Sequence, residues 1–451
     1  MRDFTVGSIT KKLLIFIFPI VCAHFVQSLY LIIDAIWVGR LIGADSLAAV
    51  STVFPVLFFL NSLLMGLGIA VNTLVGQSYG AKNNRLMEKI LKNSFLIILL
   101  LSCFISVFGI FFSSFILDLI NVPKTIEAGS YIYLVIIMFS LPFRALYNWF
   151  ASVLRGVGDS RSPLIILFVS VILNITLTPL FIEGLGCFPA MGIAGSALAT
   201  VFSAFLSTIL AYILFVKQDG IFNIVKWKIE MNLAVIKRMF SIGIPGSLNM
   251  MVRSTGWIVI IALINNFGAD LTAGYGIGMR VDMFAILPAI SIGMGISSIA
   301  AQNIGVDRFE RVRLYLKDAV FLALGLGLFM YTFVNLFGTT IAGIFTTNNA
   351  VIENAVGYIR IISFSYFVFA FMFPLQGLIR GAGHTGYLFV FSVISVLIIQ
   401  LPLAYFLSFH TFLRETGIWI AILSGILCET ALCFFYYKCG HWRRRIPEIS
   451  V

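Results

Sequence analysis

The chain has 451 residues, of which 60% are hydrophobic and only 11% are charged. Soluble domains carry roughly 25% charged residues, so this composition excludes a soluble protein and predicts an integral membrane protein. The net charge of +11 would suggest a nucleic-acid partner in a soluble protein, but in a membrane protein the position of the charges decides their meaning.

Long apolar runs recur along the whole chain. A helix needs about 20 apolar residues to cross a bilayer, and none of the short alternating segments of a membrane β-barrel is present. The chain is therefore predicted to be an all-α membrane protein with twelve transmembrane helices. In chain order the predicted spans are 13–38, 47–76, 93–112, 129–152, 162–183, 191–216, 239–264, 272–300, 317–344, 354–377, 386–409 and 416–437.

Lysine and arginine residues are unevenly divided between the two sides that these spans define. The N-terminus, alternate loops and the tail hold 23 of them, whereas the opposite loops hold only Arg40, Lys124 and Arg414. The positive-inside rule then predicts a multi-pass protein of the cell membrane with both termini in the cytoplasm. The basic excess follows from this topology and needs no nucleic-acid partner.

The two halves of the chain resemble each other at one constant offset of 225 residues. The motif GAD at 43–45 recurs at 268–270, GQSYGA at 76–81 corresponds to AQNIGV at 301–306, and RGVGD at 155–159 to RGAGH at 380–384. A duplicated six-helix unit predicts two lobes related by a pseudo-two-fold axis along the membrane normal, as in many secondary transporters. The predicted domains are an N-terminal lobe at 1–216, a cytoplasmic linker at 217–238, a C-terminal lobe at 239–440 and a cytoplasmic tail at 441–451.

The sequence contains no recognisable nucleotide-binding, metal-binding or catalytic motif. No Walker motif, no HExxH and no grouping of a nucleophile with a base is present, and the six cysteines have no metal-ligand spacing. We therefore expect no enzyme activity, no cofactor and no metal site. A structural membrane protein, a receptor and a membrane-embedded enzyme explain the internal repeat less well than a transporter driven by an ion gradient.

The first span contains one carboxylate, Asp34. Gln27, Tyr30, Asp34 and Trp37 fall on one helix face, which makes a polar and aromatic stripe on an apolar helix. A charge in a span is costly and needs a reason. The functional interpretation is that Asp34 takes up and releases a proton, while the alternative is that it lies near enough to the outer interface to reach water.

Several motifs resemble those of the multidrug and toxic compound extrusion (MATE) family. They include IIDAIWVGRLIGADSLAAVS in the first span, LRGVGDSRSPL after the fourth, LNITLTPLF in the fifth and GYGIGMRVDMFAILPAISIGMGISSIAAQNIG in the eighth. The resemblance covers nearly the whole chain and is greatest to the branch named for DNA-damage-inducible protein F. It implies a two-lobe transporter that exports organic cations in exchange for protons or sodium.

The resemblance also implies an ion-coupling site in the N-terminal lobe, formed by Asp34, Asn174, Thr178 and Thr200. Asn174 and Thr178 lie one turn apart, and hydrogen bonding between helices is an alternative role for them. Thr178 stands where related sequences often have Asp, so Asp34 is the only carboxylate expected there. Because Na⁺ favours several hard oxygen ligands, this moves the balance toward protons, although a Na⁺ site at Asp34 and Asn174 stays open.

The C-terminal lobe has Val259 in place of Asp34, so coupling is expected to be asymmetric. Arg280 and Asp282 lie two residues apart and cannot pair with each other on one helix. They are candidates either for substrate binding and coupling or for an ion network between helices.

The substrate-binding candidates are Gln27, Tyr30, Trp37, Asn148, Arg280 and Asp282. Arg144, Arg253 and Arg360 also lie in predicted spans, but their long side chains can extend from the span ends to the membrane–water interface. Glu429 lies in the last span and has no assigned role.

The sequence therefore predicts a monomeric secondary antiporter that exports amphipathic cations and is surrounded by membrane lipids. The alternative is a flippase for a lipid-linked oligosaccharide or another lipid, whose pyrophosphate the intramembrane arginines would bind.

Overall fold

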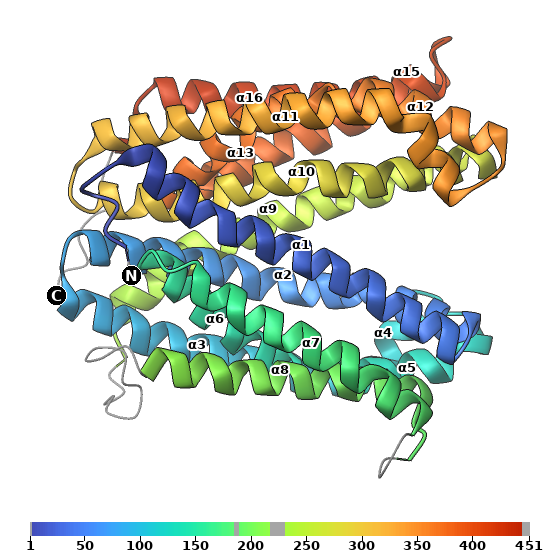
Figure 1. Ribbon diagram of the computed structural model, residues 1–451, viewed down its shortest axis with the longest axis horizontal. Coiled ribbons are helices and arrows are strands. Elements are labelled where there is room, and N and C mark those ends of the chain that lie inside the picture. The colour runs from blue at the N-terminus through green and yellow to red at the C-terminus, as the bar shows by residue number, and fades with distance from the viewer. Residues whose placement is uncertain (1, 185–188, 217–230, 444–451) are drawn as a thin grey trace. The chain divides into compact units, whose positions relative to one another are not determined.

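The computed structural model describes residues 2–184, 189–216 and 231–443, and within these ranges all regular elements are helices. Ten helical segments are long and apolar enough to cross a membrane, and two bent helix pairs raise the number of candidate spans to twelve. The long helices of each half run lengthwise in Figure 1. The predicted all-α membrane architecture is confirmed, with the twelve predicted spans falling on these segments.

The described residues of the first half form eight helices. They are α1 (Ile9–Leu41), α2 (Ala44–Gly80), α3 (Asn84–Phe111), the short α4 (Ser113–Leu119), α5 (Lys124–Met138), α6 (Leu141–Gly156), α7 (Arg161–Glu183) and α8 (Gly192–Val216). The predicted linker at 217–238 lies outside the described residues up to position 230.

The second half begins with α9 (Leu233–Asn265), α10 (Ala269–Ile304), α11 (Phe309–Phe345), α12 (Asn349–Ile362) and α13 (Ser365–Gly381). One further span is composed of α14 (Thr385–Ser392), the π-helix η2 (Val393–Gln400) and α15 (Leu401–Phe409). It is followed by α16 (Glu415–Lys438) and a 3₁₀ turn, η3 (His441–Arg443). The predicted tail lies outside the described residues from position 444.

The backbone repeats at the offset found in the sequence. The bent pair α5–α6 at 124–156 recurs at that same offset as α12–α13 at 349–381. Gly43 and Gly268, which precede α2 and α10, have φ angles of 118° and 104°. Lys82 and Asp307, which follow the same two helices, share the rare left-handed conformation with φ of 55° and 56°. A duplicated unit explains why strained backbone positions recur in register.

Helix packing repeats in the same register. A Cβ atom on Gly156 of α6 would lie 3.0 Å from the carbonyl oxygen of Asn72 in α2. A Cβ atom on Gly381 of α13 would lie 2.5 Å from the carbonyl oxygen of Ser297 in α10, and both members of this pair stand at the repeat offset from the first. Small residues at these positions let two helix backbones approach closely, which is how helices commonly associate inside a membrane.

Two of the candidate spans are bent. The angle between α5 and α6 is 46°, and that between α12 and α13 is 50°. At each break a serine hydroxyl, on Ser140 or Ser363, donates to the carbonyl group three residues earlier, a bond that competes with the helix ladder. Pro142 at the start of α6 adds a residue that has no backbone N–H.

Contacts divide the described chain into two compact units. One contains Arg2 and the described part of 18–244, and the other contains Asp3–Ile17 and the described part from Pro245 onward. The boundaries fall inside α1, just before Pro19, and inside α9 at Pro245. The repeat alone does not indicate that the start of the chain belongs with the second unit. Fully buried Phe4 shows the reason, because its backbone N–H donates to Gln302 Oε1 at 3.0 Å.

The helices differ in how much of their surface the protein covers. Two thirds (67%) of the most apolar window of α10 is buried, whereas the corresponding value for α11 is 17%. α10 packs against α11, α12 and α13 and is the central helix of its unit. Large apolar side chains such as Phe111 and Ile344, which are 81% and 77% exposed, suit contact with lipid rather than water.

Candidate functional site

The first unit contains a chain of hydrogen bonds between α1, α7 and α8. Tyr30 Oη lies 3.4 Å from Thr200 Oγ1, and Asn174 Nδ2 donates to the same Thr200 oxygen at 3.3 Å. Thr178 Oγ1 donates to Asn174 Oδ1 at 3.1 Å. The structure thus brings together three of the four predicted ion-coupling residues, Asn174, Thr178 and Thr200, together with the predicted substrate-binding residue Tyr30.

The direction of these bonds can be worked out from the available protons. Thr200 donates its one hydroxyl proton to the carbonyl oxygen of Ser196 at 3.3 Å, so its oxygen accepts from both Tyr30 and Asn174. Tyr30 therefore uses its only proton on Thr200. No proton of Tyr30 is left for the carboxylate of Asp34, which lies one turn further along α1.

Asp34 makes no hydrogen bond or ion pair to any part of the chain that the structure describes. Its Oδ1 atom is buried without a partner, and so is Nε1 of Trp37 in the next turn. Tyr30 and Tyr133 are near enough to Asp34 to interact electrostatically with its carboxylate. Arg144 acts on the same two tyrosines but lies beyond ion-pair distance of Asp34. A buried oxygen without a donor is a costly arrangement that binding of a proton or a cation would relieve.

Two further substrate-binding candidates of the first unit are less enclosed. Gln27 is exposed, and Asn148 in α6 is half-buried and forms no hydrogen bond with the Tyr30–Thr178 group among the described residues. No group of three or more His, Cys, Asp or Glu side chains that could hold a metal ion occurs in the described ranges.

A second buried carboxylate, Asp282, lies on α10 in the second unit. Tyr366 donates to its Oδ1 at 2.6 Å, and Tyr358 donates to its Oδ2. The ring of Tyr358 packs edge-on against Tyr275 and Trp419, with ring centres 5.3 and 4.9 Å away. Asp282 is thus held by two tyrosine hydroxyls inside an aromatic cluster.

Arg280 is exposed and does not pair with Asp282. Its guanidinium lies over the ring of Phe345, 5.8 Å from the ring centre. The expectation of an ion network between helices at these two residues is therefore wrong for the described chain, because the partners are hydroxyl groups and an aromatic ring. Tyr358 and Tyr366 had no signal in the sequence analysis, since the bend between α12 and α13 brings them to one carboxylate.

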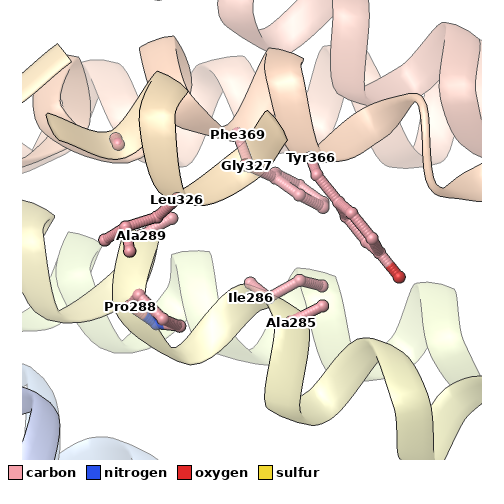
Figure 2. Close-up of a pocket in the computed structure, with 9 residues that line it drawn as sticks. Ala285, Ile286, Pro288, Ala289, Leu326, Gly327, Tyr366 and Phe369 are labelled. Carbon is pink, nitrogen blue, oxygen red and sulfur yellow. The ribbon is translucent and has the colours of Figure 1, made fainter. Parts of the chain in front are cut away.

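A small pocket lies next to Tyr366, between α10, α11 and α13. Figure 2 shows the tyrosine ring extending past it, with the hydroxyl group directed away from the apolar side chains. That hydroxyl is bonded to Asp282, so the pocket offers no charged or free polar side chain to a cation. Its lining residues are Ala285, Ile286, Pro288, Ala289, Ala323, Leu326, Gly327, Tyr366 and Phe369.

A third polar cluster, also in the second unit, was not predicted. Glu429 on α16 is 2% exposed and forms an ion pair with Arg253 on α9. The sequence analysis assigned no role to Glu429 and suggested that Arg253 extends to the interface. The two residues are 176 positions apart, and no local pattern connects them.

Comparisons with known proteins agree with this helical architecture. The family model described as MatE matches the chain twice, at residues 19–180 and 245–406. The chain belongs to the MatE family. The starts of the two matches, at positions 19 and 245, agree to within one position with the offset of the internal repeat.

Individual relatives of this MATE protein span almost its whole length. A probable multidrug resistance protein of Bacillus subtilis, YoeA, is 30% identical over 446 residues, 98% of this chain and 96% of the relative. The probable multidrug resistance protein NorM of Thermotoga maritima is 24% identical, covering 98% and 94% of the two chains. A crystal structure of a MATE protein in the straight conformation superposes with a TM-score of 0.89 at 23% identity, covering 97% of each chain.

Membership of the family settles the class of protein. MATE proteins are multi-pass membrane transporters coupled to ions and are not enzymes, which confirms the predicted transporter class. The resemblance to the branch named for DNA-damage-inducible protein F stays a prediction.

Proposed function

We propose that this MATE protein exports amphipathic organic cations in exchange for protons, and that Asp34 is the carboxylate that carries the proton. Drug export is suggested by the Bacillus subtilis and Thermotoga maritima relatives, which are described as probable multidrug resistance proteins. That the drugs are cations is what the resemblance to the MATE family implies. The positive-inside rule orients both termini toward the cytoplasm, so that export runs from that side.

One observation carries the role of Asp34. Its Oδ1 atom is buried and accepts no hydrogen bond, while the neighbouring polar groups Tyr30, Thr200 and Asn174 are bonded to one another. An antiporter needs a group that binds its ion and its substrate in turn, and therefore one that is not tied to a permanent partner. A carboxylate in this state can be neutralised by a proton in one step and by a substrate cation in another.

Protons suit this site better than sodium. A sodium ion prefers several hard oxygen ligands, but Asn174 Oδ1 already accepts from Thr178, and the Thr200 oxygen already accepts two bonds. Bringing these oxygens to a cation would break the hydrogen-bond chain. Proton binding at Asp34 requires no such rearrangement.

The test is efflux of a fluorescent cation from proteoliposomes under an imposed pH or Na⁺ gradient. We expect the wild-type protein to respond to the pH gradient, and Asp34→Asn to reduce that response by about tenfold or more, which corresponds to ~1.4 kcal/mol. Asp45→Asn, which removes an exposed carboxylate at the start of α2, is the matched control. Retained pH-driven efflux by Asp34→Asn would rule out this role for Asp34. Efflux that depends on the Na⁺ gradient alone would show that Na⁺, and not the proton, is the coupling ion. Absence of transport under either gradient would favour the lipid flippase.

A further inference from the structure

An apolar groove lies between α13 and α16, which pack against each other in the second unit. The hydroxyl group of Thr430, which is part of its lining, donates to the carbonyl oxygen of Ile426 in the same helix at 2.8 Å. The groove therefore presents apolar surface to a ligand. Its volume is about 270 Å³, and its lining residues are Phe371 and Leu375 of α13 and Leu427, Thr430, Ala431 and Phe434 of α16.

The walls of this groove reach the surface of the unit. Phe371, Leu427 and Phe434 are 41%, 45% and 42% exposed. Apolar side chains exposed to this extent are unfavourable in water but suit contact with hydrocarbon. A concave apolar surface also contacts a flexible chain from two sides, which adds to the dispersion energy that a flat surface would supply. The chemical group that fits the groove is therefore an acyl chain.

A cation lies at the end of the groove that Phe434 forms. Lys438, the last residue of α16, follows Phe434 by one helical turn, and its ammonium group lies 5.1 Å from the centre of that ring. Attraction between an ammonium group and an aromatic face holds the two together. Lys438 is exposed and forms no ion pair with an acidic side chain of the described residues. Its charge is therefore available to an anionic group next to the groove.

The turn that follows α16 holds a second cation in place. Gly440 has a φ angle of 73° and leads into η3, where Trp442 is buried and donates from Nε1 to the carbonyl oxygen of Tyr437 at 3.2 Å. The guanidinium group of Arg443 lies over the Trp442 ring, 5.5 Å from its centre. Arg443 is exposed, like Lys438, and forms no ion pair within the described ranges. The fold thus fixes two cations beyond the end of the groove.

The groove and the cations follow one another along α16 in the order of the parts of a phospholipid. The positive-inside rule orients Lys438 toward the cytoplasm. The cytoplasmic leaflet carries anionic lipids, and basic side chains just beyond the end of a membrane helix attract them. An acyl chain in the groove would place a headgroup phosphate near the end of α16, where the cations are.

We propose that the groove between α13 and α16 binds one anionic phospholipid, with an acyl chain along the groove and the headgroup phosphate at Lys438 and Arg443. The chain would contact both helices beside the hydrogen bond of 3.0 Å that Gln376 of α13 donates to Glu429 of α16. The bound lipid therefore stabilises the contact between these two helices. The site uses none of the residues around Asp34 and does not depend on the transported ion or substrate.

Native mass spectrometry of the protein released from detergent tests this site. Phosphatidylglycerol, which has a net negative charge, and phosphatidylcholine, which has none, are titrated with identical acyl chains. The masses of free and lipid-bound protein give both dissociation constants. We expect tighter binding of phosphatidylglycerol, and we expect Lys438→Gln to reduce that preference about fivefold, as loss of one basic side chain near a membrane surface would.

The matched control for this charge is Lys317→Gln. Lys317 of α11 is exposed and also lies over a phenylalanine one turn away, with its ammonium group 5.9 Å from the centre of the Phe321 ring, but it does not line the groove. This variant is expected to keep the full preference for phosphatidylglycerol.

A second variant tests the apolar part of the site. Ala431→Phe adds a ring inside the groove, so it is expected to weaken binding of both lipids by a similar factor. Ala262→Phe adds the same ring to an exposed position of α9 outside the groove and is expected to leave both dissociation constants unchanged. Size-exclusion chromatography verifies that each variant is folded, and Ala431→Leu replaces Ala431→Phe if the larger side chain prevents folding.

Several outcomes would overturn the proposal. They are equal binding of the two lipids by the wild-type protein, the same loss of preference in Lys438→Gln and Lys317→Gln, or the same effect of Ala431→Phe and Ala262→Phe. A wild-type mass of two chains that Ala431→Phe reduces to one would assign the groove to a second copy of the chain, and it would likewise contradict a lipid site.

Discussion

Tyr366 donates a hydrogen bond of 2.6 Å to Oδ1 of Asp282. With Tyr358 on the second oxygen, the carboxylate is solvated by hydroxyl groups inside the membrane rather than neutralised by an arginine. This arrangement explains how a span can hold a carboxylate that is only 6% exposed. It also gives the second unit a buried acidic group whose partners differ in kind from the surroundings of Asp34.

Tyr366→Phe is expected to destabilise the protein, because it leaves one buried carboxylate oxygen without its donor. A hydrogen bond to a charged group contributes ~1.5–3 kcal/mol, and each kcal/mol shifts the melting temperature by about 2–4 °C in a unit of this size. Intrinsic tryptophan fluorescence in detergent measures the change, with Trp419 next to the site as a reporter.

The control is Tyr331→Phe, which removes a hydroxyl that bonds to no part of the described chain. Equal melting temperatures for the Tyr366→Phe and Tyr331→Phe proteins would show that the bond to Asp282 contributes nothing to stability.

The sequence was informative wherever the chemistry is local or periodic. Span lengths, the basic loops and the constant offset between the two halves predicted the helices and their duplication, because each depends on composition along a single stretch. Asn174 and Thr178 were correctly expected to lie on one face, since residues four apart on a helix are neighbours.

The remaining contacts depend on tertiary structure. Tyr358 and Tyr366 reach Asp282 through the 50° bend between α12 and α13, and the sequence has no pattern that predicts this convergence. The pair of Arg253 and Glu429 joins helices at opposite ends of the second half of the chain. Such pairs become visible only when the fold brings distant polar side chains into contact.

Thr178→Asp is expected to make the stability of the first unit depend on a bound cation. The side chain is fully buried and bonded to Asn174, so a carboxylate there would be buried without a counter-charge among the described residues. A buried charge in a span costs ~2.5–3.5 kcal/mol, and Na⁺ would supply compensation. The melting temperature of this variant should be lower than that of the wild type in choline chloride and should recover in sodium chloride.

Thr178→Asn has a similar size without the charge and is the matched control. Recovery of stability by Na⁺ in both variants, or in neither, would contradict the idea that the missing carboxylate at this position limits Na⁺ binding.

The ion pair between Arg253 and Glu429 predicts strongly non-additive mutations. Glu429→Met should destabilise the protein by about 3–5 kcal/mol, because it leaves the guanidinium groups of Arg253 and Arg380 in the membrane without their shared carboxylate. Adding Arg253→Met to that variant should restore part of the loss. Melting temperatures of the two single variants and the double variant give the coupling energy, and strictly additive losses would show that the pair does not contribute.

Close contact between α10 and α13 is expected to be the most substitution-sensitive packing in the second unit. A Cβ atom on Gly377 would lie 2.1 Å from the carbonyl oxygen of Gly293, which belongs to the backbone and cannot rotate away. Gly377→Ala should therefore force α10 and α13 apart and lower the melting temperature by several degrees, as overpacking of ~1–3 kcal/mol would.

Gly386→Ala supplies the contrast, because a Cβ atom on Gly386 of α14 meets no atom within 4 Å. Alanine has a higher helix propensity than glycine by ~1 kcal/mol, so this substitution should leave stability unchanged or raise it. Since Gln376, next to Gly377 on α13, donates to Glu429, Gly377→Ala should also displace the Glu429 cluster. A Gly377→Ala protein as stable as Gly386→Ala would mean that α10 and α13 can separate without cost, contrary to the packing described for these helices.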